Sequence, residues 1–201
     1  LREDGAAVLS HHWDAVVLSP GPGHPAKAAD FAQTAAGLAL ASAPDDLPVL
    51  GVCLGHQGLA WFYGARVAAM RKPRHGIVDA VTFSEEDATL LRGLPSGFGA
   101  TRYHSLTIVD DFRLEKSPLV PTAWSNDGDV LAVQHRHLPR FGLQFHPESV
   151  ATQYGGLIAR NFAEVCRSRR TSSSTKDSTL VLTRSERRRT TRQREETTNA
   201  T

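Results

Sequence analysis

The 201-residue chain has 40% hydrophobic and 22% charged residues, which is ordinary for a globular domain with a sizeable core. Its two cysteines, Cys53 and Cys166, do not make a disulfide framework. No apolar run approaches the roughly 18–20 residues that cross a bilayer, and no basic-then-apolar signal opens the chain. We therefore expect a cytoplasmic protein that does not associate with membranes.

The formal charge of +2 is unevenly distributed. From Arg167 to Thr201, ten Lys/Arg face four acids, so this tail carries +6 and residues 1–166 carry −4. The tail is rich in Ser, Thr and Arg and cannot bury enough apolar surface to offset its ordering entropy. We expect a folded domain over residues 1–166 and a disordered tail or linker over 167–201. An Arg-rich nucleic-acid arm is the alternative, but no aromatic residue in the tail could stack on bases, and we expect no nucleic-acid partner.

The first part of the domain alternates between strand and helix patterns. "DAVVL" (14–18) is an apolar run that ends at the turn cluster "SPGPGHP" (19–25). The Ala-rich residues 26–41 have apolar side chains at helical spacing. "VLGV" (49–52) reads as a second buried strand, and "LGHQGLAWFYGA" (54–65) as a helix ended by a glycine. This order predicts parallel strands covered by helices on both faces.

Beyond Arg66 the pattern changes to short alternating segments separated by turn signals, which favours antiparallel strands. These segments are "RVAAM", "GIVDAVTF", "ATRYHSLTIV", "PTAWS" and "DVLAVQHRHLPRFGLQF". Residues 152–168 then have apolar side chains on one helical face. We predict an α/β fold with a mixed, largely parallel central sheet flanked by helices.

Cys53 lies in "GVCLGHQG", directly after an apolar strand and before a helix. Small residues on both sides, here Gly51 and Gly55, permit the tight strand-to-helix turn called a nucleophile elbow. At the start of a helix, the dipole favours a thiolate and free N–H groups face a developing oxyanion. A free cysteine is also commonly an inert core residue, and the turn alone leaves the two readings about equal.

A nucleophilic cysteine needs a base, and "QFHPES" offers one. His146 follows an apolar strand, and Glu148 stands two positions on across the rigid Pro147. His146 would take the thiol proton while Glu148 orients its ring; a surface His-Pro-Glu turn is the alternative. His135 and His137 share one face of a strand, but two ligands without a third are a weak metal signal. We therefore predict no metal site.

The turn "SPGPGHP" lacks the G-x-G-x-x-G spacing of a dinucleotide fingerprint. It offers a rigid backbone with exposed N–H groups at the carboxyl end of a strand, where α/β sheets bind ligands. An ordinary tight turn is the alternative.

Four motifs in this order, "SPGPGHP", "GVCLGHQ", "RYHSL" and "FGLQFHPES", resemble the class I glutamine amidotransferases over residues 14–166. The form of "SPGPG", "RYHSL" and "HPES" is most similar to the branch that serves chorismate-using enzymes, rather than the GMP or carbamoyl-phosphate synthetase branches.

The resemblance implies a triad of Cys53, His146 and Glu148. It implies an oxyanion hole from the N–H of Leu54 and one N–H of the Gly-Pro-Gly turn. It also implies glutamine contacts from Gly21, Pro22, Gly23, Leu54, Gln57, Ser105 and Leu106. Without the resemblance, Gln57 would be read as helix surface, and Ser105 and Leu106 as plain strand positions.

The implied reaction is hydrolysis of L-glutamine through a γ-glutamyl thioester, with ammonia passing to a chorismate-binding synthase domain or subunit. No cofactor is expected in this domain, and Mg²⁺ is expected only in the partner synthase. Residues 72–76 and 148–162 look more like the aminodeoxychorismate branch, which belongs to folate and p-aminobenzoate synthesis. The amidotransferase component of anthranilate synthase, in the tryptophan pathway, is the alternative.

The family normally opens with a strand, a helix and a second strand that are not recognisable here, about one β-α-β unit. A sheet without that unit would expose apolar surface and unpaired backbone, so we expect residues 1–201 made alone to be poorly soluble. Two other readings stay open: an inactive truncated fragment, and a Cys-His hydrolase of another class. Gln57 and the Gly-Pro-Gly turn argue against the hydrolase.

Overall fold

A computed structural model describes residues 13–84 and 88–169. The chain divides into two units, Leu1–Val165 and Cys166–Thr201. In the second unit only residues 166–169 are described, and they are helical; the predictions made for the rest of the tail, like those for residues 1–12, lie outside the described residues. No helix in the described ranges is long and apolar enough to cross a membrane.

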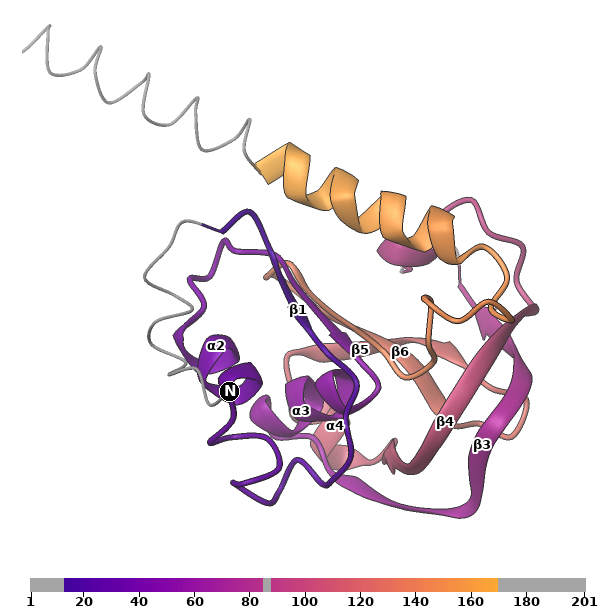
Figure 1. The fold of residues 1–201 in the computed structure, drawn as a ribbon, viewed down its shortest axis with the longest axis horizontal. Helices are drawn as coiled ribbons and strands as arrows, with labels where there is room; N and C mark the ends of the chain where they lie inside the picture. Colours follow the sequence, from indigo (N-terminus) through magenta and orange to yellow (C-terminus); the bar gives the residue numbers. More distant parts are fainter. Residues whose placement is uncertain (1–12, 85–87, 170–201) are drawn as a thin grey trace, which may run out of the picture. The chain divides into compact units, whose positions relative to one another are not determined.

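The first unit is built on a seven-stranded sheet in the order β1-β2-β7-β6-β5-β3-β4. Figure 1 shows β1 and the β3–β4 pair towards opposite ends of this sheet. The strands are β1 Val16–Leu18, β2 Val49–Val52, β3 Val67–Phe83, β4 Phe98–Ile108, β5 Leu119–Trp124, β6 Val130–His135 and β7 Arg140–Leu143. The helices α2 Ala35–Ser42, α3 Leu54–Phe62 and α4 Phe112–Lys116 accompany them, with a 3-10 turn at Thr89–Leu91, and residues 155–165 are also helical.

The sheet is mixed, as predicted, but the prediction that it is largely parallel is wrong. Among the strands of the described ranges, β1–β2 and β2–β7 pair in parallel, while β7–β6, β6–β5, β5–β3 and β3–β4 are antiparallel. The reason is that β5, β6 and β7 follow one another through short turns, and short turns permit only antiparallel neighbours. The parallel part is therefore confined to three strands.

Two strands of the parallel part are completely buried. Every residue of β2 and of β7 is buried, the pattern of strands covered on both faces. Helix α3 packs against β1, β2 and β7 and buries its first seven residues. This helix, together with the ends of β2 and β7, positions the candidate site.

The predicted helix over residues 26–41 is wrong in its first part. Residues 26–34 form turns, and the helix begins only at Ala35. The carboxylate of Asp30 accepts a hydrogen bond from the backbone N–H of His24 at 2.9 Å, and the hydroxyl of Thr34 accepts one from Gly37 at 3.4 Å. These side chains compete for backbone groups and favour turns and caps over helix.

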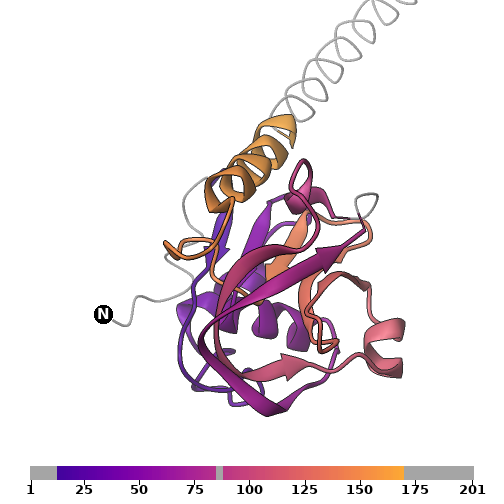
Figure 2. The ribbon, with the colours of Figure 1, turned by 90° about the vertical axis from the view of Figure 1, so that its right-hand side faces the viewer.

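β3 and β4 form a long antiparallel pair (Figure 2). The two segments predicted separately, 66–70 and 76–83, belong to the single strand β3, apart from Arg66, which precedes it. Its register with β4 is interrupted, because Ala69 pairs with Leu106 and the next pair is Arg74 with His104. The intervening residues of β3 form a bulge that faces the middle of "RYHSL".

Candidate active site

Cys53 lies at the turn between β2 and α3, in the position that caps the helix. Its φ is +53°, in the region that L-residues rarely adopt. The turn is possible because its flanks are glycines: a Cβ on Gly51 would lie 2.4 Å from the carbonyl oxygen of Gly55. The Cys53 N–H donates to the Leu143 carbonyl at 2.8 Å, which ties the turn to β7. This is the strand–cysteine–helix turn that the sequence predicted.

The thiol of Cys53 is buried and close to β4. Its Sγ lies 3.9 Å from the carbonyl oxygen of Tyr103. Burial raises the pKa of Cys53 to about 11; the Leu54 N–H acts in the opposite direction, and the Glu148 carboxylate raises the pKa further. An unassisted thiol at this position is protonated at neutral pH, so thiolate chemistry here requires a neighbouring base.

His146 and Glu148 form the pair that the sequence predicted. Nδ1 of His146 and Oε1 of Glu148 are 2.7 Å apart. An ionised carboxylate only accepts hydrogen bonds, so Nδ1 carries the hydrogen and Nε2 is left as the acceptor. Nε2 is buried and has no hydrogen-bond partner among the described residues. The pair thus presents the ring nitrogen that can take a proton.

Tyr103 connects the cysteine with the histidine. Its carbonyl contacts the Cys53 thiol, and its ring packs edge-on against the ring of His146, with centroids 5.3 Å apart. Tyr103 lies within the motif "RYHSL", but no role was predicted for it. Tyr103 of β4 therefore contacts two of the three predicted triad members, Cys53 and His146.

The Gly-Pro-Gly turn lies beside the start of α3. A Cβ on Gly21 would contact the Leu54 side chain at 3.2 Å. Gly23 has φ +111°, and a Cβ there would overlap the side chain of Asp30 at 2.6 Å. Gly21, Pro22 and Gly23 are exposed, so the N–H groups of the two glycines lie at an accessible turn next to the residue that follows Cys53. The oxyanion hole from the Leu54 N–H and one N–H of this turn stays a prediction.

Gln57 is buried, only 3% exposed, rather than on the helix surface. Its Nε2 donates to the Leu106 carbonyl at 3.1 Å and to Oε1 of Gln144 at 3.0 Å. Ser105 is exposed, and its hydroxyl lies 2.8 Å from Nε2 of His75. The structure thus brings Gln57 and Leu106 together, and no hydrogen bond in the described part of the chain links them to the Gly-Pro-Gly turn.

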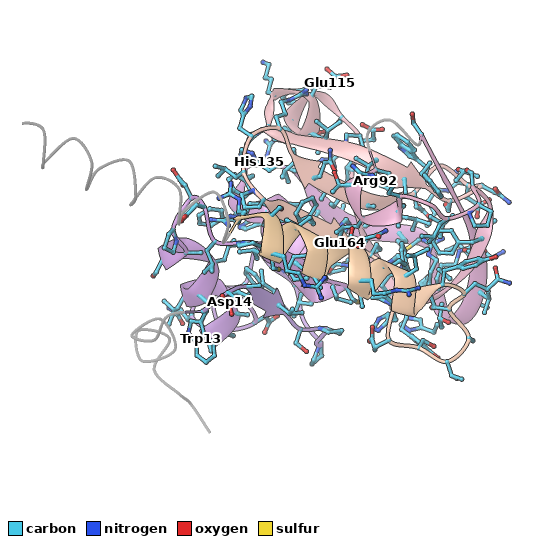
Figure 3. The ribbon with its side chains drawn as sticks, turned by 90° about the horizontal axis from the view of Figure 1, so that it is seen from above. Trp13, Asp14, Arg92, Glu115, His135 and Glu164 are labelled. Carbon is cyan, nitrogen blue, oxygen red and sulfur yellow. The ribbon has the colours of Figure 1, made fainter. Side chains whose placement is uncertain are left out.

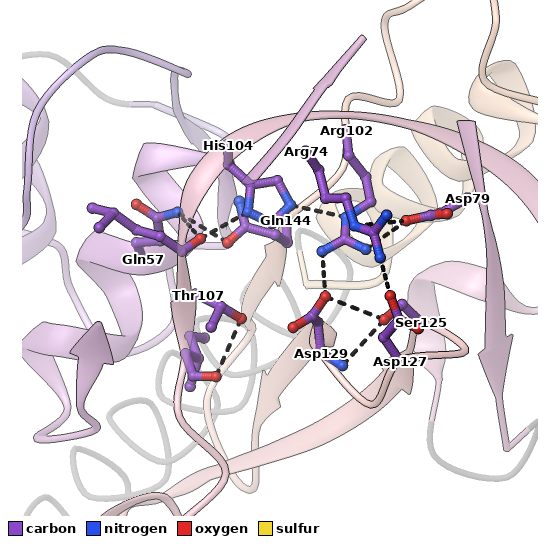
Figure 4. A network of polar contacts seen from close by, with 12 residues as sticks. Gln57, Arg74, Asp79, Arg102, His104, Thr107, Ser125, Asp127, Asp129 and Gln144 are labelled. Atoms are coloured by element: carbon purple, nitrogen blue, oxygen red, sulfur yellow. Dashed lines mark hydrogen bonds and ion pairs between the residues drawn. The ribbon is translucent and has the colours of Figure 1, made fainter. Parts of the chain in front are cut away.

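A buried polar network continues from Gln57 along β4 (Figure 4). Its central members, Arg102, His104 and Gln144, were not predicted from the sequence. The available signal was that "RYHSL" lies in a predicted strand, where alternate residues face opposite sides. In the structure Arg102 and His104 share the buried side, and Tyr103 and Ser105 the exposed one. Polar residues on the buried face of a strand need partners, and so mark such a network.

His135 and His137 do not gain a third ligand. His135, labelled in Figure 3, uses its Nδ1 to accept from the backbone N–H groups of His137 at 3.1 Å and Leu138 at 3.0 Å. Within residues 13–84 and 88–169 no group of three or more His, Cys, Asp or Glu is placed to hold a metal ion. The ring of His135 stabilises the turn after β6.

A cavity of about 560 Å³ opens at the bulge of β3 and contains none of the predicted site residues. It is lined by Ala69, Met70, Arg71, Lys72, Arg74, Thr107, Asp127 and Asp129. Its walls are mostly charged, with Arg74 ion-paired to Asp127. The candidate site is defined by the Cys53 turn and not by this cavity.

A sequence model of the family described as "Glutamine amidotransferase class-I" matches residues 3–166. The chain belongs to the class I glutamine amidotransferase family. This amidotransferase chain is 49% identical over 156 residues to an aminodeoxychorismate synthase of Streptomyces griseus, covering 76% of the chain and 20% of that relative. It is 39% identical over 180 residues to anthranilate synthase component 2 of Mycobacterium tuberculosis, covering 90% of the chain and 72% of the relative.

Among solved structures, the amidotransferase chain is similar to a protein of Thermoplasma acidophilum described as a GMP synthase subunit. The TM-score is 0.72 at 28% identity, over 86% of this chain and 81% of that one. The chain spans about a fifth of the length of its two Streptomyces relatives. The domain fold and the family are therefore shared over most of the chain, while the long relatives contain much more than this domain.

Proposed function

We propose that this chain is a glutaminase: it hydrolyses L-glutamine at Cys53 and releases ammonia to a chorismate-binding synthase. The observation that carries the proposal is the strained Cys53 turn at the start of α3, with Tyr103 in contact both with Cys53 and with His146 of the His146–Glu148 pair. Membership of the amidotransferase family supports the same reaction.

The first step is the formation of the thiolate. His146 Nε2 takes the proton of the Cys53 thiol, and Glu148 stabilises the resulting imidazolium through its bond to Nδ1. Because burial alone raises the thiol pKa to about 11, this transfer supplies the nucleophile at neutral pH. Positioned acid–base catalysis of this kind contributes about 10²–10⁴ in rate.

The thiolate sulfur then attacks the side-chain amide carbon of glutamine, and the C=O bond becomes an oxyanion. The N–H of Leu54 and an N–H of the Gly-Pro-Gly turn stabilise that charge, each donor being worth about 10²–10³ in rate. His146 returns its proton to the leaving nitrogen, ammonia departs, and a thioester remains on Cys53. Water activated by His146 cleaves the thioester, giving glutamate and the free thiol.

The glutamine itself is held by the segments on either side of the cysteine. Gly21, Pro22 and Gly23 form one wall, and Gln57, Ser105 and Leu106 the other. The register of β3 and β4 skips Ser105, and we assign its backbone to the substrate's polar groups. These contacts fix the amide of the substrate against Cys53.

The ammonia acceptor is a chorismate-binding synthase, first of the aminodeoxychorismate type and alternatively of the anthranilate type. Relatives of both names match the chain, at 49% and 39% identity, and residues 72–76 resemble the first type. Such a synthase would bring its own Mg²⁺, and the amidotransferase domain would need no cofactor. We place the reaction in the cytoplasm.

Glutamate release from glutamine tests the proposal. The chain, made alone or together with a chorismate-binding synthase, should produce glutamate, and Cys53→Ser should abolish this. Cys166→Ser is the matched control, because Cys166 is the other cysteine of the chain and should leave the rate unchanged. Absence of turnover with the synthase present would instead favour the inactive fragment, and equal loss in both variants would remove Cys53 from the mechanism.

The acceptor is identified by the product. With a synthase, chorismate and Mg²⁺ present, glutamine should support formation of 4-amino-4-deoxychorismate. Formation of anthranilate would establish the alternative. Glutamine hydrolysis with neither product would refute both chorismate partners while leaving the glutaminase intact.

A further inference from the structure

The carbonyl of Leu106 is held by two side chains from different elements. Nδ1 of His104 lies 2.7 Å from this oxygen, and Nε2 of Gln57 lies 3.1 Å from it. A carbonyl oxygen has two lone pairs, so both are used. The orientation of the Leu106 peptide is therefore set by one residue of β4 and one of α3.

The same contacts fix the tautomer of His104. A carbonyl can only accept, so Nδ1 must carry the hydrogen that it donates to Leu106. Nε2 is then unprotonated, and it accepts from Nε of Arg102 at 2.9 Å. Burial lowers the pKa of His104 to about 4, which is consistent with this neutral form. Both ring nitrogens are used, and the ring cannot turn without breaking a bond.

Arg102 anchors this ring from the other side. It is completely buried, and its two terminal nitrogens each lie 2.7 Å from a carboxylate, one of Asp79 and one of Asp129 (Figure 4). A buried guanidinium in which each of the three nitrogens donates a hydrogen bond is a fixed donor. Hydrogen bonds thus link alternate residues along the inner face of β4 into a rigid series: Arg102, His104 and Leu106.

This series crosses the point where the register between β3 and β4 is interrupted. Leu106 pairs with Ala69 and His104 with Arg74, while Ser105 between them has no partner in the register. A backbone segment outside the ladder needs another support to keep a fixed geometry. Two histidines make contacts there: Nε2 of His75 lies 2.8 Å from the Ser105 hydroxyl, and Nδ1 of His104 donates to the Leu106 carbonyl at 2.7 Å.

We propose that His104 is a positioning residue for glutamine binding. In its neutral form, anchored by Arg102, it holds the Leu106 peptide and with it the Ser105–Leu106 segment in the geometry that receives the substrate. It acts through that segment and does not contact the reacting atoms. The inference rests on the proposed glutaminase function, because it concerns the glutamine contacts of the same site.

Two amide substitutions test the two hydrogen bonds of the His104 ring one at a time. In His104→Asn, the side-chain nitrogen occupies the place of Nδ1 and keeps a donor for Leu106. In His104→Gln, the amide reaches the place of Nε2 and keeps an acceptor for Arg102, but the donor to Leu106 is lost. Loss of one such hydrogen bond corresponds to about a tenfold change in affinity.

We expect His104→Gln to raise the KM for glutamine about tenfold with kcat within about threefold, and His104→Asn to rescue most of that loss. A second readout does not depend on turnover: glutamine should protect Cys53 from alkylation by iodoacetamide, and the protecting concentration should rise in parallel with KM. His137→Gln, at an exposed histidine, is the control for the substitution itself. Thermal melting of every variant shows which of them fold.

The outcomes separate this inference from the function on which it rests. If the unsubstituted chain neither hydrolyses glutamine nor is protected by it, the proposed function fails and the inference with it. If it is protected but the Asn and Gln variants have the same KM, the inference is wrong and the function stands. If the KM changes only follow the melting temperatures, or if both variants lose cooperative melting, His104 acts on the stability of the fold. Either outcome also overturns the inference.

Discussion

Replacing Gly55 by alanine should push the start of α3 away from β1. Gly55 is the second residue of α3, and a Cβ there would lie 2.2 Å from the carbonyl oxygen of Leu18 and 2.7 Å from its Cβ. Ordinary contact begins at 3.4 Å, so the helix and the strand must separate by about 1 Å. The obstacle is backbone, which cannot rotate aside as a flexible side chain would.

The displacement has two consequences of known size. Over-packing of this kind destabilises a fold by about 1–3 kcal/mol. The helix start also holds the Leu54 N–H next to the Cys53 sulfur, and a misplacement of about 1 Å in an active site costs on the order of 10²-fold in rate. We therefore expect kcat for glutamine hydrolysis to fall about a hundredfold, or about 2.7 kcal/mol in activation free energy.

Urea unfolding and glutamate release measure the two effects. Gly156→Ala is the matched control, since Gly156 is also helical and a Cβ there meets nothing within 4 Å. It should be neutral or stabilise the fold by up to about 1 kcal/mol. The reasoning is refuted if Gly55→Ala has the same urea midpoint as the unsubstituted chain and a kcat within threefold of it. In that case the close packing of α3 on β1 does not position the site.

Two further predictions concern the base and the buried arginine. His146→Gln leaves the Cys53 thiol without its base, and burial raises the pKa of this thiol to about 11. The thiolate fraction, and with it the rate of Cys53 alkylation by iodoacetamide, should therefore rise about tenfold per pH unit between pH 8 and 10. If the variant is alkylated as fast as the unsubstituted chain at pH 7, His146 is not the base. Arg102→Leu leaves two carboxylates and a histidine without their buried donor and should lower the free energy of unfolding by about 3–5 kcal/mol. Arg66→Leu removes an exposed ion pair and should have little effect on urea unfolding. If Arg66→Leu and Arg102→Leu lower the free energy of unfolding equally, the burial of Arg102 does not explain its contribution to stability.

The turn at Cys53 was predictable because its causes are local. Gly51 and Gly55 flank the cysteine, an apolar strand precedes it and a helix follows, and the structure has this arrangement with a positive φ at Cys53. The His146–Glu148 contact was also predictable, because only one rigid residue separates the two. The catalytic roles of these residues stay predictions for the experiments above.

The strand order was not predictable from local pattern. β2 and β7 pair in parallel although most of the domain separates them in sequence, and no periodicity within either strand specifies its partner. The turns over residues 26–34 show the opposite difficulty. The helical spacing was present, but the side chains of Asp30 and Thr34 accept hydrogen bonds from backbone N–H groups, which favours turns and caps over helix.

The buried polar residues were the hardest to predict. Gln57 was read as helix surface without the family resemblance, because a polar residue on an amphipathic helix normally faces water. It is buried because Leu106 and Gln144, both distant in sequence, supply its partners. Arg102 is buried for the same reason, since Asp79 and Asp129 approach it from other parts of the chain.

The alternation along β4 has a consequence for how this domain can diverge. Tyr103 and Ser105 face outward while Arg102 and His104 face inward. Substitutions on the outer side can therefore alter ligand binding at the site without disturbing the buried hydrogen bonds of Arg102 and His104. A one-residue insertion in this segment would have a different result, because it would exchange the two faces and bring the buried charges to the surface. Variation among related domains should therefore be tolerated at single outward positions of β4, while changes in its length are excluded.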